Sequence, residues 1–204
     1  MMRRLGAALL ASAAALAACS SDSDPVEPTT QSDEQSVDGH ETAGEDGVMS
    51  VEDGVATSTD GRLTFPVLDG WQAYPAPLDP RVNITVLLIS DVNNAEFAAN
   101  VVGTWADPVP GVPSSYEEWE AESGNVFTGD GVTVEDAAPI EIGGQTVKGL
   151  QVERSLDGIT VKQLVYPIFT DEGMQELAFS ASPDVFDENV DDVIDMFTQM
   201  ELNF

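Results

Sequence analysis

The stretch IEIGGQTVKGLQVERSLDGITVKQLVYPIF, residues 140–169, decides the fold of this chain. Its Gly143-Gly144 and Asp157-Gly158 dipeptides are typical of two-residue hairpin turns, which need positive φ. Segments rich in β-branched and apolar residues flank both turns, so the stretch predicts three antiparallel strands. Counting outward from the second turn gives this expected register: Leu156 opposite Ile159, Arg154 opposite Val161, Glu153 opposite Lys162, Val152 opposite Gln163 and Leu150 opposite Val165.

The segments around this stretch extend the sheet. Asp171-Glu172-Gly173 predicts a third hairpin, which leads into a strand over 174–181. Gly149 suggests a bulge, because Val147 and Leu150 otherwise face opposite ways. Upstream, apolar runs and alternation predict strands near 63–65, 83–90 and 98–106. The sheet is therefore expected to be an antiparallel meander with additional strands.

Two helices are expected beside the sheet. Ser114 or Ser115 is a suitable N-cap for a polar helix that runs to about Glu122. Ser182-Pro183 starts a second helix, since proline is tolerated in a first turn. Its apolar residues recur at helical spacing and predict one buried stripe: Phe186, Val190, Val193, Ile194, Phe197 and Met200. The chain is thus expected to be an α/β (α+β) protein with helices flanking an antiparallel sheet.

The N-terminal segment is typical of a secretory signal. Arg3 and Arg4 precede about thirteen small and apolar residues, fewer than the roughly 20 that a membrane-spanning helix needs. The run Leu16-Ala17-Ala18-Cys19 resembles the bacterial lipobox, whose cysteine is diacylated and becomes the new N-terminus. We therefore expect a lipoprotein signal peptide over 1–18 and lipid attachment at Cys19, on the extracytoplasmic face of a bacterial cell membrane.

An acidic segment follows Cys19. Residues 20–60 contain twelve Asp and Glu, no Lys or Arg and no aromatic residue. Low hydrophobicity with charge of one sign cannot offset the entropy of ordering, so we predict a disordered tether over 19–60 and a globular domain over 61–204.

The charge of the chain limits its partners. Of seven basic residues, Arg3 and Arg4 leave with the signal, and five remain against 37 acidic ones, a net charge of −32. Such a charge repels phosphates and anionic headgroups, so nucleic acid is not an expected partner. Contact with the membrane is expected only through the lipid at Cys19, and the domain is expected to be a monomer.

Catalytic residue types are scarce in the expected domain. His40 is the sole histidine and Cys19 the sole cysteine, so the domain has neither a Ser-His-Asp triad nor a histidine-ligated zinc site. Asp130 with Glu135 and Asp136 is the remaining candidate for a hydrolytic carboxylate pair. The acidic face over 184–195 lacks EF-hand spacing. We expect no catalytic residues, no metal and no cofactor.

Four residues are candidates for contact with a partner or ligand. Trp71, Tyr116 and Trp119 are aromatic, and tryptophan and tyrosine are frequent interface anchors, although core packing is their commoner role. Trp119 is the tryptophan we expect to be exposed, because its helix is the more polar one. Arg154 is expected on an apolar sheet face, where it either binds an acidic ligand or lays its stem on apolar surface.

The order of elements resembles that of the actinobacterial LpqN/LpqT-type lipoproteins. The likeness covers residues 60–204 and the lipobox, and it rests on Gly70-Trp71, the strand AANVV (98–102), the Tyr116 and Trp119 helix, PIEIGG (139–144) and FSAS (179–182). The resemblance implies a Mog1/PsbP-like α/β/α sandwich and a binding or assembly role without catalytic residues. In that family only the position of Cys19 has a transferable function.

Three functions remain open from the sequence. The first is a non-catalytic adaptor for envelope proteins, which predicts an exposed apolar patch. The second is a carrier of a lipid or small hydrophobic ligand, which requires an apolar cavity of roughly 300–1,000 Å³ between sheet and helix. The third is a carboxylate-dependent hydrolase, which requires two carboxylates in one cleft.

Overall fold

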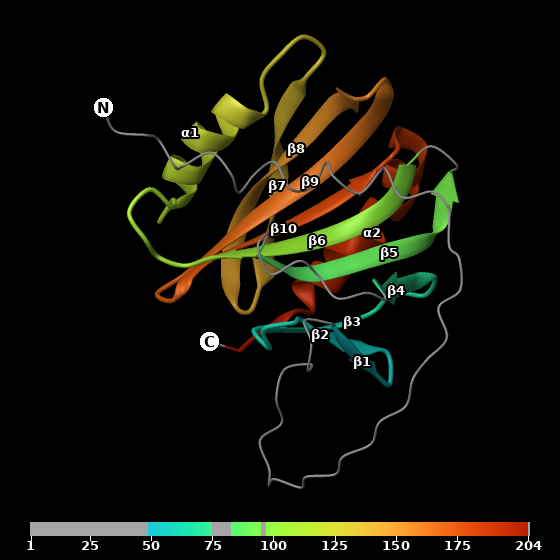
Figure 1. Cartoon of the computed structure of the whole chain (residues 1–204), viewed down its shortest axis with the longest axis vertical. Helices are drawn as coiled ribbons and strands as arrows, with labels where there is room; N and C mark the ends of the chain where they lie inside the picture. Colours follow the sequence, from blue (N-terminus) through green and yellow to red (C-terminus); the bar gives the residue numbers. More distant parts are fainter. Residues whose placement is uncertain (1–48, 75–82, 95–96, 204) are drawn as a thin grey trace, which may run out of the picture.

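A seven-stranded antiparallel sheet is the centre of the computed structural model, which describes residues 49–74, 83–94 and 97–203 (Figure 1). Within these residues the strand order is β4-β5-β6-β10-β9-β8-β7. The predicted signal peptide, Cys19 and most of the predicted tether lie outside the described residues. The strands of this sheet are β4 (Trp71–Ala73), β5 (Ile84–Asn94), β6 (Phe97–Ala106), β7 (Thr133–Ile142), β8 (Gln145–Leu156), β9 (Ile159–Thr170) and β10 (Gly173–Ala181).

The meander from β7 to β10 confirms the expected turns and register. Asp157 and Gly158 both have positive φ, as do Gly143 and Gly144. Every pair that the count from Asp157-Gly158 predicts is found between β8 and β9. The turn residues therefore set the register, because a two-residue loop allows the flanking strands to pair in only one way.

The expected bulge occurs beside Gly149, but the extra residue is in the partner strand β7 and not in β8. The register shifts in β7, between Ala137 and Ile140, where Pro139 has no N–H to give to the ladder. The carbonyl of Ala138 accepts a 2.7 Å hydrogen bond from the Tyr166 hydroxyl instead. Val147 and Leu150 do face opposite sides of the sheet, and both are buried because each side has its own core.

A small four-stranded sheet corrects the predicted domain boundary. Residues 49–60, which we expected in the disordered tether, contain β1 (Ser50–Glu52) and β2 (Val55–Thr57). β2 pairs with β3 (Leu63–Pro66), and β3 pairs with the C-terminal β11 (Glu201–Leu202). Ala56 is fully buried among the residues of the main core. Backbone pairing of β2 with β3 and the burial of Ala56 order this segment in spite of its acidic composition.

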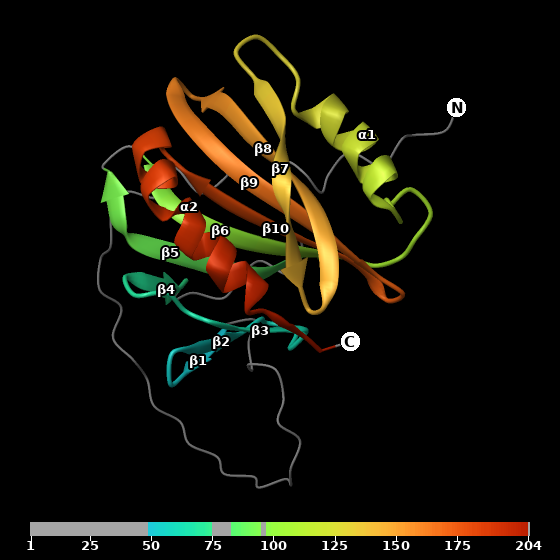
Figure 2. The same ribbon diagram turned by 180° about the vertical axis from the view of Figure 1, so that it is seen from behind.

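Helix α2 (Pro183–Thr198) confirms the predicted apolar stripe on one side of the sheet (Figure 2). Phe186 stacks on Phe179 of β10 at 5.1 Å between ring centroids. Phe197 meets Tyr166 of β9 edge-on at 6.3 Å. These rings belong to the larger of two apolar cores, which also contains Trp71 and residues of the small sheet. Aromatic packing of this kind is a major stabilising term.

Helix α1 (Tyr116–Val126) lies on the opposite side of the sheet, against β8, β9 and β10 (Figures 1 and 2). It begins at the N-cap Ser115, whose hydroxyl accepts a hydrogen bond from the Glu118 N–H at 3.3 Å. The helix ends four residues later than predicted, and Phe127 at its C-cap is buried in the smaller core. The expected architecture, an antiparallel sheet with a helix on each face, is thereby confirmed.

Candidate functional site

Trp119 attaches α1 to the sheet through the carboxyl group of a half-buried glutamate. The indole Nε1 donates a 2.8 Å hydrogen bond to Oε2 of Glu176, which lies in the middle of β10. By strand alternation Glu176 shares its face with Met174 and Ala178, both part of the smaller core. Trp119 is fully buried, so the expectation that it is the exposed tryptophan is wrong. The polar helix buries its one tryptophan because that ring is its main apolar contact.

The carboxyl of Glu176 has an unusual protonation state. Burial raises its pKa to about 7, because the charged form loses hydration, and the hydrogen bond from Trp119 opposes this rise. At neutral pH the group therefore exists in both protonation states. Sequence reasoning did not single out Glu176. The sequence feature that could have indicated it is that Glu176 is the one charged residue on a strand face shared with Met174, Ala178 and Ser180.

Two basic side chains hold the ends of α1. The Lys148 ammonium is 5.4 Å from the ring centroid of Tyr116, at the start of the helix. The Arg154 guanidinium is 5.4 Å from the ring centroid of Phe127, at its end. Burial lowers the pKa of Arg154. A cation near a helix C-terminus is favourable, since that end carries partial negative charge.

The structure places three of the four predicted contact residues on one side of the sheet, with Arg154 at the other end of α1 from Tyr116. Tyr116, Trp119 and Arg154 all lie on the α1 side, where the rings of Tyr116 and Trp119 are 5.7 Å apart. Tyr116 is half-buried, and burial followed by the charge of Glu120 raises its pKa to about 12. Trp71 is on the other side, against Phe179 at 5.9 Å. Trp71 and Trp119 are both buried, so neither offers a ring to a partner in this conformation.

The α1 side also contains polar atoms without partners. Among the described residues four buried side-chain atoms make no hydrogen bond, namely Asn100 Oδ1, Ser123 Oγ, Arg154 Nε and Gln163 Oε1. Asn100 and Gln163 are aligned with Ser180 across β6, β10 and β9, and Ser180 accepts a 2.9 Å bond from Gln163. Unsatisfied buried groups cost stability, so their gathering on one side is notable.

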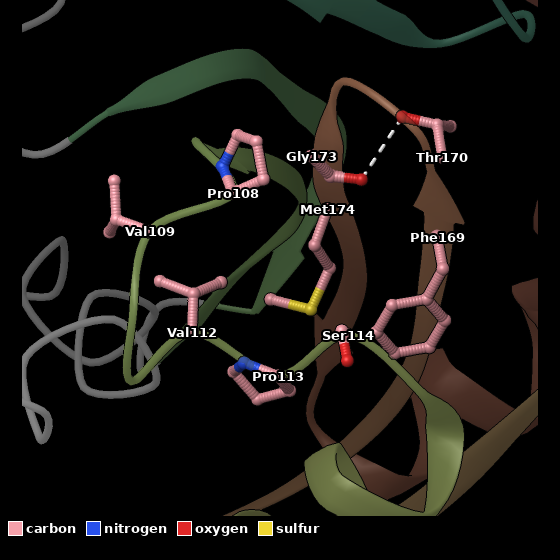
Figure 3. A pocket seen from close by; sticks show the side chains of 9 residues that line it. All are labelled: Pro108, Val109, Val112, Pro113, Ser114, Phe169, Thr170, Gly173 and Met174. Atoms are coloured by element: carbon pink, nitrogen blue, oxygen red, sulfur yellow. Dashed lines mark hydrogen bonds between the residues drawn. The ribbon is translucent and has the colours of Figure 1, made fainter.

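A small hollow, lined mostly by apolar side chains but also by polar atoms, opens beside the start of α1 (Figure 3). Its volume is about 200 Å³. The 107–115 loop and the β9–β10 hairpin form its walls, and Met174 extends between them in Figure 3. Val109 at its rim is 55% exposed. The residues that line it are Pro108, Val109, Val112, Pro113, Ser114, Phe169, Thr170, Gly173 and Met174.

Backbone geometry makes this hollow rigid. The Val112 N–H donates to the Val109 carbonyl at 3.0 Å within the proline-rich loop. On the other wall the Thr170 hydroxyl donates to the Gly173 carbonyl at 3.0 Å. A side chain at Gly173 would collide with the Ala106 carbonyl and the ring of Trp105, so only glycine permits this close approach. Both walls are thus held before anything binds.

The predicted carboxylate pair is not brought together in one cleft. Asp130 is exposed in the turn between α1 and β7, while Glu135 and Asp136 are exposed, consecutive residues of β7. Consecutive strand residues point to opposite faces. Among residues 49–74, 83–94 and 97–203, no three histidine, cysteine or acidic side chains form a group that could hold a metal ion. No helix within these residues is long and apolar enough to cross a membrane.

The fold defines an α+β protein whose antiparallel sheet has a helix on each face. Solved structures similar to this chain include LpqN of Mycobacterium tuberculosis, which is involved in cell envelope biogenesis. The two sequences are 16% identical over a match that covers 70% of this chain and 83% of the LpqN chain, with a TM-score of 0.49. Cyanobacterial PsbP (CyanoP) from Synechocystis is 11% identical, over a match that covers 77% of this chain and 94% of the CyanoP chain, with a TM-score of 0.47. No family model and no curated protein matches the sequence.

Proposed function

We propose that this chain is a lipid-anchored extracytoplasmic adaptor that binds envelope proteins and has no catalytic activity of its own. The observation that carries the proposal is the exposed, rigid hollow beside α1. At about 200 Å³ it suits one or two protein side chains and is smaller than the roughly 300–1,000 Å³ typical of small-molecule sites.

The N-terminal sequence supports the anchoring part of the proposal. Cys19 directly follows small residues and a short apolar run, and the segment between Cys19 and Met49 is acidic and free of lysine and arginine. As a flexible chain, a segment of about 30 residues has an end-to-end distance on the order of 30 Å. An anchored domain on such a tether samples proteins near the membrane at a raised effective concentration.

The carrier function is the second candidate, and the packing under α2 does not favour it. It requires a cavity between sheet and helix, where the described residues place stacked rings instead. Phe179, Phe186 and Phe197 are all fully buried there. The hollow beside α1 is the place where a small hydrophobic ligand would have to bind instead.

Native mass spectrometry of the full chain, purified from its own membranes in mild detergent, tests the proposal. We expect a mature mass that starts at Cys19 and carries a diacylglyceryl group, with an additional mass of protein size. The matched control joins residues 1–48 to an unrelated acidic domain, which keeps anchor and tether but should lose the added protein. An added mass of several hundred daltons, bound only by the native domain, would support the carrier function and contradict the adaptor.

A further inference from the structure

Acidic side chains surround the hollow. The two segments that frame it, residues 107–120 and 169–174, contain six acidic residues and no lysine or arginine. All six are exposed: Asp107, Glu117, Glu118, Glu120, Asp171 and Glu172. Arg62, the cation that stacks on neighbouring Trp105, is paired with Asp60 at 2.9 Å. These two segments therefore carry six negative charges, of which the Lys148 ammonium, 5.4 Å from the Tyr116 ring centroid, offsets only part.

We infer that the hollow binds a basic segment of a partner protein, which inserts one aliphatic side chain between Val109 and Met174 while flanking lysine or arginine residues meet the acidic rim. The inference rests on the proposed function and names the partner chemistry. Charge complementarity of this kind steers association and rejects acidic partners. It also disfavours a second copy of this chain, whose net charge is −30.

The size and rigidity of the hollow specify the inserted group. A volume of about 200 Å³ admits a leucine or methionine side chain and is too small for a folded lipid chain. Three prolines of the 107–115 loop, Pro108, Pro110 and Pro113, restrict its backbone, and turn hydrogen bonds fix it further. A preformed site loses little entropy on binding, so even a short peptide should bind measurably.

Three blocked pentapeptides test the inference against the full mature chain with Cys19→Ser, labelled with ¹⁵N. The probe KRLRK has the proposed chemistry, KRSRK lacks the apolar side chain and GSLSG lacks the charges. We expect KRLRK to shift the amide signals of Val112, Gly173 and Met174, with a Kd of about 1 mM at low salt. KRSRK and GSLSG should each bind at least about tenfold more weakly, since each lacks one of the two contributions.

Matched variants locate the binding. Val109→Ser removes an exposed rim side chain and should weaken KRLRK severalfold, whereas Val134→Ser, at a 40% exposed position of β7, should leave Kd unchanged. Equal binding of KRLRK and KRSRK would overturn the inference, because charge alone would then explain it. Stronger shifts from decanoate than from KRLRK would overturn it in favour of a lipid. Concentration-dependent broadening at the hollow without peptide would overturn it in favour of self-association.

The two proposals fail independently. If no pentapeptide binds at the hollow while native mass spectrometry still shows the added protein, the inference about the hollow is wrong and the adaptor function stands. If KRLRK binds as expected while the full chain carries only a small ligand, the hollow recognises basic segments and the adaptor function is wrong.

Discussion

The two faces of the seven-stranded sheet differ in what they bury. On the α2 face the core is apolar, its rings stack, and the buried amide of Gln175 is satisfied by Thr85 at 3.2 Å. On the α1 face the core is smaller and contains the Glu176 carboxyl and all four of the unpartnered atoms found among the described residues. The α2 face is built for stability, and the α1 face keeps polar groups that stability alone does not require.

A cavity in the α2 face should destabilise the chain most. Phe186→Ala should lower the free energy of unfolding by about 3–5 kcal/mol, because it leaves a cavity among stacked rings. Urea denaturation followed by circular dichroism measures it. Phe169→Ala removes the same atoms at a half-buried site on the α1 side and should cost about 1–2 kcal/mol. Equal losses would contradict the difference between the faces.

The second prediction concerns the charge beneath α1. The pKa of Glu176 is about 7 in the folded chain and near 4.5 when unfolded, so the folded chain holds the proton more tightly. The contribution of the Glu176 carboxyl to the free energy of unfolding is fully present below pH 4.5, falls as pH rises to about 7 and stays low above that. Glu176→Gln should therefore match the native stability near pH 4.5 and exceed it by about 3 kcal/mol at pH 8.

Urea titrations at the two pH values measure this difference. Glu172→Gln is the matched control, since it makes the same change at an exposed turn and should alter stability by less than about 0.5 kcal/mol. A Glu176→Gln variant whose advantage is the same at both pH values would show that the carboxyl does not titrate in this range.

The third prediction distinguishes the packing of the Trp119 ring from the hydrogen bond that its N–H donates. Trp119→Phe keeps an aromatic ring but loses the donor to Glu176, which should cost about 2 kcal/mol at pH 8. Because that bond lowers the pKa of Glu176, its loss should move the carboxyl titration upward in ¹³C NMR. Amide exchange should accelerate in α1 and stay slow in α2. An unchanged titration midpoint would contradict the assigned role of the indole.

The smallest expected effect tests how α1 begins. Ser115→Ala removes the acceptor for the Glu118 N–H and should cost about 1 kcal/mol, seen mainly as faster amide exchange in the first turn of α1. Ser155→Ala makes the same substitution at an exposed site of β8 and should change nothing measurable in α1. Equal exchange in the two variants would mean that the contacts of Trp119 alone keep the helix formed.

Much of the fold followed from local sequence. The register of β8 and β9 was predictable because Asp157-Gly158 forces a two-residue turn, and the stripe of α2 was predictable because helical spacing places Phe186 and Phe197 on one face. The candidate site was much less predictable. Trp119 was placed wrongly, because the polarity of its helix does not reveal which side chain fills a gap above a distant strand.

The turns, the strand pairing of the meander, the two helices and the charge of the chain follow from the amino-acid sequence, since these depend on neighbouring residues and on composition. Three features become visible only in the folded chain: residues 49–60 join a second sheet, Glu176 lies beneath Trp119, and two segments about 60 residues apart enclose the hollow. These features depend on contacts between segments distant in the chain, and no local pattern specifies which partners packing will bring together.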